Sequence, residues 1–143
     1  MSHEVVRFRQ KHKLFPMINL EVALALTAHW GLELLDSENP NDIPLRNLLT
    51  GWLERLRMTA AFFDSELDER LVDEQDRARL VRLLDRSIET VQEFGDNVPA
   101  ELLNRVLRLQ GIGSFEKGFP VDVVRRTIGE LRELVSSQSA GPS

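Results

Sequence analysis

The chain has no cysteine and only three histidines among its 143 residues. The absence of cysteine excludes disulfides, thiolate-bound metals, iron–sulfur clusters and cysteine nucleophiles. A small secreted domain usually depends on disulfides, so their absence favours a cytoplasmic protein. Arginine outnumbers lysine fifteen to three, which indicates a GC-rich bacterial genome.

Charge is almost missing from residues 14–35, where only Glu21 and Glu33 are ionised at neutral pH. A helix that faces water on one side carries a polar face of several residues over such a length. Pro16 and several polar residues interrupt the segment, which makes it too short and too polar to span a bilayer. We therefore expect a buried helix over residues 19–36, either central in a bundle or at a dimer interface, and no membrane association.

No segment convincingly predicts a strand, and apolar residues recur at helical spacing along most of the chain. The composition, 42% apolar and 29% charged, is typical of one globular domain. The sequence thus predicts an all-α fold, a single compact bundle of about five helices. The expected organisation is a basic N-terminal arm at 1–18, an all-helical domain at 19–135 and a disordered tail at 136–143.

The second helix is expected to be unusually long. Pro44 suits its first position, and apolar residues then recur every three or four positions from Leu45 to Leu71, about seven turns. An alternative is a break near Ser65, which would cap a separate short helix. The later helices are expected near residues 73–95, 99–111 and 121–135, the first of them capped by Asp73.

The formal net charge is −5, and its distribution disfavours nucleic acid as a partner. The stretch from Asp64 to Glu101 holds twelve acidic residues against five arginines, and such a surface repels phosphate backbones. The first twenty residues hold four basic residues against Glu4. This arm leaves nucleic-acid association as a second alternative function.

Paired glutamates raise the question of a metal site. Glu66 and Glu69 stand three residues apart, as do Glu130 and Glu133, so each pair could share a helix face. The all-α nucleotide pyrophosphohydrolases, which this chain resembles in helix count, use acidic pairs of this general kind. A leucine of the expected buried face stands beside each pair, so the two carboxylates are not expected to converge. A metal-dependent enzyme is therefore the alternative interpretation, and we predict no metal and no cofactor.

His29 is the one histidine inside an expected helix. The chain also resembles phosphotransfer bundles in helix count, but their histidine is exposed and followed by a lysine and a glycine. Here Trp30 and Gly31 follow, and the surrounding helix is apolar. We interpret His29 as an interior or interface residue.

Helix 73–95 carries a row of arginines, Arg79, Arg82 and Arg86. We expect them to pair locally on a solvated face, and an anion or acidic-peptide site is the minority alternative. The acids close enough in sequence for local pairing are Asp76, Asp85, Glu89 and Glu93.

The chain has more apolar helix surface than a single core would bury, which favours a non-enzymatic interaction or regulatory module. Two adjacent phenylalanines widen the apolar arc of the second helix, and two more stand in the glycine-rich loop 111–120 as a lid or a contact surface. We expect the protein to self-associate, as a homodimer, or to bind another protein. The predicted interface residues are His29, Trp30, Trp52, Phe62, Phe63, Phe115 and Phe119.

Overall fold

The computed structural model describes residues 3–58, 66–109, 111 and 114–136. These residues form six helices and two small antiparallel sheets, so the expected all-α bundle of five helices is wrong. The elements run in the order β1 (His3–Phe8), β2 (Lys11–Pro16), α1 (Met17–Leu34), α2 (Ile43–Arg57), α3 (Leu67–Arg70), α4 (Glu74–Gln92), β3 (Asn97–Val98), α5 (Ala100–Leu107), β4 (Phe119–Pro120) and α6 (Val121–Ser136).

A β-hairpin, β1–β2, occupies most of the segment expected to be a basic arm. It carries Val6, Phe8 and Phe15 into the core. Its two-residue turn places Arg9 and Gln10 in the left-handed region, with φ of 50° and 69°. Such a turn is normally signalled by Asn-Gly or Asp-Gly, and this sequence offers neither. The turn is instead held by its surroundings, since the Arg9 amide donates to Asp68 Oδ1 over 2.8 Å and its guanidinium pairs with Glu74.

The expected long second helix is divided in the structure. Helix α2 ends at Arg57, and Met58 is extended. Leu67 and Leu71, which continue the apolar pattern, reach the same core from the four-residue helix α3 and the residue after it. The pattern therefore reports burial and not helix continuity. Ser65, the alternative cap, lies outside the described residues.

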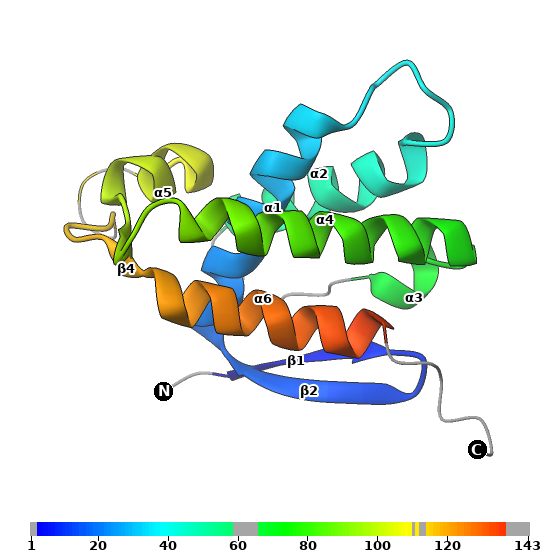
Figure 1. Cartoon of the computed structure of the whole chain (residues 1–143), viewed down its shortest axis with the longest axis horizontal. Helices are drawn as coiled ribbons and strands as arrows, with labels where there is room; N and C mark the ends of the chain where they lie inside the picture. Colours follow the sequence, from blue (N-terminus) through cyan, green and yellow to red (C-terminus); the bar gives the residue numbers. More distant parts are fainter. Residues whose placement is uncertain (1–2, 59–65, 110, 112–113, 137–143) are drawn as a thin grey trace.

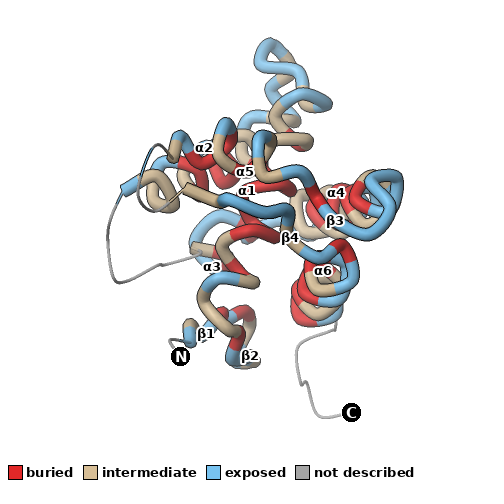
Figure 2. The backbone as a smooth tube through the Cα atoms, turned by 90° about the vertical axis from the view of Figure 1, so that its left-hand side faces the viewer, coloured by how far each residue is buried: buried red, intermediate tan, exposed pale blue. Residues whose placement is uncertain are grey.

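Helix α1 occupies the middle of the fold. It packs against α2, α4, α5 and α6 and against the hairpin (Figure 1). Every residue from Val22 to Ala28 is buried, and Figure 2 shows buried positions on α1 and on the sides of α2, α4 and α6 that face it. The near absence of charge in this helix is thus explained by cover from its own chain.

Helix α4 is fixed at both of its ends and along one side. Helices α4 and α6 lie side by side (Figure 1), and Asp73 caps α4 by accepting from the Gln75 amide, as the sequence predicts. At the other end of α4, the short β3–β4 pair brings Phe119 opposite Val98.

Two helix glycines give a matched test of this packing. A Cβ on Gly31 would lie 2.5 Å from Leu49 Cδ1 and 2.6 Å from Leu83 Cδ2, whereas one on Gly129 meets nothing within 4 Å. We expect Gly31→Ala to lower the free energy of unfolding by about 1–2 kcal/mol, because both leucines must move within the core. Gly129→Ala is expected to raise it by about 1 kcal/mol through helix propensity. Urea unfolding of both variants checks the opposite signs; equal effects would contradict the close crossing at Gly31.

The hairpin turn gives a second test. Gln10 is exposed and left-handed, a conformation that costs a non-glycine residue about 1 kcal/mol. We expect Gln10→Gly to raise the free energy of unfolding by about 0.5–1 kcal/mol, since glycine adopts positive φ freely. Thermal unfolding measures the change. A loss of stability would show that the turn does not have this geometry.

Candidate interaction surfaces

The predicted interface residues are divided between core and surface. Trp52 is 2% exposed and shares a small apolar void with Leu24, Leu80 and Leu84, so it offers no surface to a partner in this fold. Phe62 and Phe63 lie outside the described residues. The other four predicted residues are partly exposed.

Trp30 and His29 lie toward the C-terminal end of α1. The Trp30 ring stacks on Phe94, which follows the end of α4, with centroids 6.3 Å apart. Leu34, one helical turn after Trp30, is 53% exposed and Phe94 is 37% exposed. His29 Nε2 lies 3.4 Å from Glu33 Oε1 at the surface. This end of α1 therefore presents an apolar patch of Trp30, Leu34 and Phe94.

The loop phenylalanines face each other and the core. The rings of Phe115 and Phe119 meet edge to face at 6.3 Å, and both pack against core residues. The Asn104 side chain bonds the Phe115 backbone twice, accepting from its amide over 2.6 Å and donating to its carbonyl over 2.9 Å. These contacts fix Phe115 to α5 and hold both rings against the core.

The glutamate pairs do not assemble a metal site. Glu66 lies 2.5 Å from Arg55 and 3.4 Å from Arg70, and these guanidinium groups hold the pKa of its carboxyl below the usual range. Glu130 lies 3.9 Å from Lys13 Nζ. Glu69 and Glu133 are exposed. Within the described ranges, no three acidic or histidine side chains gather at metal-binding distance.

The arginines of α4 do not all pair locally. Arg79 donates to Asp42 Oδ1 over 2.8 Å, at the start of α2. Asp85, in turn, accepts from Arg132 of α6. Arg79 and Asp85, for which the sequence suggests partners within α4, therefore pair with residues outside this helix.

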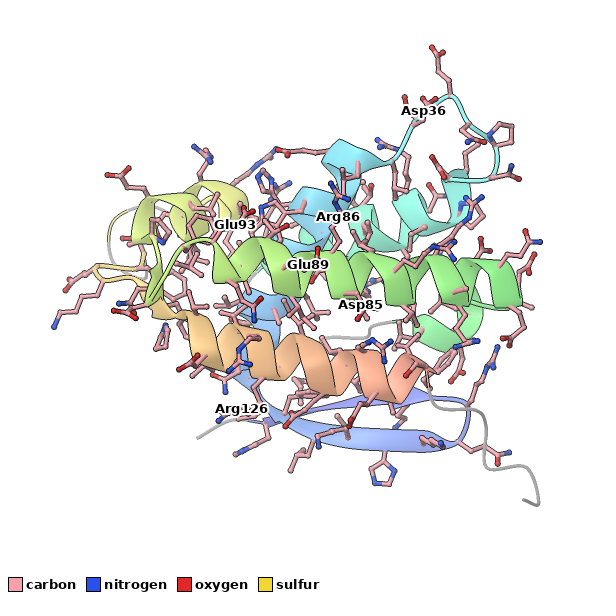
Figure 3. All side chains as sticks on the ribbon, in the orientation of Figure 1. Asp36, Asp85, Arg86, Glu89, Glu93 and Arg126 are labelled. Atoms are coloured by element: carbon pink, nitrogen blue, oxygen red, sulfur yellow. The ribbon has the colours of Figure 1, made fainter. Side chains whose placement is uncertain are left out.

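Four other charged residues form an exposed row along α4, which we call the α4 stripe: Arg82, Arg86, Glu89 and Glu93. At 100° per residue they project within an arc of about 60° on the side opposite the buried face. Figure 3 labels three of them and also Asp85, which lies toward α6. In the part of the chain that the structure describes, none of these four side chains forms a hydrogen bond or an ion pair.

The order of charge along the α4 stripe is two positive residues followed by two negative ones. The spacing was visible in the sequence, as steps of four, three and four residues. What the sequence did not show is that the neighbouring acid Asp85 accepts from Arg132 of α6 and does not pair with Arg82, three residues before it.

No helix among the described residues is both long enough and apolar enough to cross a membrane. The chain matches no family model, and no curated protein and no solved structure matches it.

Proposed function

We propose that the protein is a non-enzymatic interaction module that self-associates through the α4 stripe, with a second copy of the chain as the partner. The two copies of α4 lie antiparallel in this arrangement, related by a two-fold axis. The absence of cysteine fits a protein of the reducing cytoplasm. The observation that carries the proposal is the order of charge along the stripe.

The order of charge along the stripe is self-complementary. A two-fold axis between Ser87 and Ile88 places Arg82 opposite Glu93 of the second copy, and Arg86 opposite Glu89. Each such pair then occurs twice, because a two-fold interface brings the same surface patch of both subunits together. A parallel arrangement would place like charges together, so the stripe also selects the orientation.

Charge alone does not supply the strength of such an association. An exposed ion pair contributes about 0–1 kcal/mol, and the stripe is only about 16 Å long at 1.5 Å per residue. The apolar patch of Trp30, Leu34 and Phe94 lies beside the Glu93 end of the stripe and provides apolar area to bury. In this proposal the apolar patch gives affinity and the stripe gives register.

The metal-dependent alternative has no comparable support. Its four glutamates are spread over α3, the residue before it and the C-terminal half of α6, and two of them face arginine or lysine. The self-association proposal instead accounts for a row of charged side chains that lacks partners within the described chain.

Charge reversal tests the proposal directly. We expect Arg82→Glu/Arg86→Glu, which makes the stripe uniformly negative, to weaken self-association at least about tenfold, as does Glu89→Arg/Glu93→Arg, which makes it positive. An equimolar mixture of the two variants is expected to form a heterodimer. Reversing all four charges restores a self-complementary order and so restores the homodimer. Sedimentation equilibrium at about 0.05 M and about 1 M salt measures the association constant of each variant and of the mixture. The association constant is expected to be smaller at the higher salt concentration.

The matched control is Arg125→Glu/Arg126→Glu, which changes the net charge equally on exposed positions of α6. This control is expected to leave the association constant unchanged. A monomeric wild-type chain at every concentration, or equal loss in control and stripe variants, would sink the proposal.

A further inference from the structure

The side of the β1–β2 hairpin that faces away from the core carries apolar residues where an exposed sheet face is normally polar. Alternation along the two strands puts six residues on this side. We call them the outer face of the hairpin: His3, Val5, Arg7, His12, Leu14 and Pro16. Figure 1 shows the hairpin at the edge of the molecule, beneath α6.

Val5 and Leu14 are direct cross-strand partners on the outer face, and they are 37% and 56% exposed. Ile18, in the first turn of α1 just beyond the hairpin, is 42% exposed. The inner face already supplies the core through Val6, Phe8 and Phe15. The apolar side chains of the outer face therefore add nothing to this core. Grouped exposed apolar residues of this kind mark interaction sites.

The ionised group of the outer face is positive and has no acid beside it on that face. Arg7 stands there opposite His12, whereas Lys11 and Lys13 pair with Phe8 and Val6 on the inner face. The one acid of the hairpin, Glu4, pairs with Phe15 on the inner face. A second copy of the chain would bring this positive charge against itself, whereas an acidic partner complements it.

The dimensions of the hairpin fit a helix laid across the two strands. Six residues per strand give a length of about 20 Å at 3.3 Å per residue. A helix of about 13 residues has the same length, and its diameter of about 10 Å matches the width of a two-stranded ribbon. We infer that the outer face of the hairpin docks an acidic amphipathic helix of another protein, with Val5, Leu14 and Ile18 against its apolar side and Arg7 against its acidic flank. This surface is separate from the α4 stripe, and its test does not depend on self-association.

A designed peptide provides the probe. A fluorescent 14-residue peptide of leucine and glutamate, with leucine at i, i+3, i+4 and i+7, presents one apolar face and acidic flanks. A matched peptide with lysine in place of glutamate and a single-stranded oligonucleotide of similar length are the competitors for the surface. We expect the acidic peptide to bind at least about tenfold more tightly than either, by fluorescence anisotropy at about 0.1 M salt.

Two kinds of variant locate the site. Leu14→Ser and Val5→Thr remove apolar contact at exposed positions and are each expected to weaken binding of the acidic peptide several-fold. Arg7→Glu is expected to weaken it by a similar factor and to reduce its dependence on salt. The matched controls are Ile43→Ser, at a residue 43% exposed on α2, and Arg105→Glu on α5. Neither control is expected to change binding.

Equal affinity for the acidic and basic peptides would overturn the proposal, as would preference for the oligonucleotide, which would indicate nucleic-acid binding. Binding that survives Val5→Thr and Arg7→Glu would also overturn it. A melting curve for each variant separates loss of the surface from loss of the hairpin. Should Leu14→Ser unfold the hairpin, Val5→Thr and Arg7→Glu, which keep strand-compatible residues, carry the test.

Discussion

The fold depends on covering the middle of α1, residues 22–28, from every side. Seven consecutive buried residues, from Val22 to Ala28, leave this helix no face that tolerates water. Helices α2, α4, α5 and α6 and the hairpin all pack against it. At Gly31 the approach is so close that two leucines occupy the space of a Cβ. Contact with α1 thus determines which side each surrounding element buries. The opposite, solvent-facing sides remain available for contacts with other molecules.

The outer sides differ in how their charges are used. Ion pairs between elements, such as Arg79 with Asp42 and Arg132 with Asp85, fix helices to one another. The α4 stripe has no partner among the described residues, and the hairpin combines positive charge with exposed apolar residues. Self-pairing suits the first surface because its charge order is self-complementary. An acidic partner suits the second because its charge is of one sign.

Helical spacing predicted most of the helices but missed the end of α2 and the strands. The Asp73 cap and the apolar face of α6 follow local rules that one helix obeys alone. The hairpin was missed because its turn, Arg9-Gln10, uses left-handed residues without glycine and depends on contacts with Asp68 and Glu74, more than fifty residues away. Residues 45–71 predicted one helix because Leu67 and Leu71 keep the spacing of a helix that has already ended.

For the candidate surfaces too, some features follow from the sequence and others only from the fold. The sequence by itself determined that the charge-poor segment is a buried helix, since burial of apolar side chains follows from composition and period. It also contained the charge order of the α4 stripe. Only the tertiary structure decided that α1 is covered by its own chain, that Trp52 is core, and that Val5 and Leu14 point outward together. The physical reason is that the burial of a side chain and its ion pairs depend on residues far away in the sequence that the fold brings next to it. The local period of apolar residues carries no information about those distant neighbours.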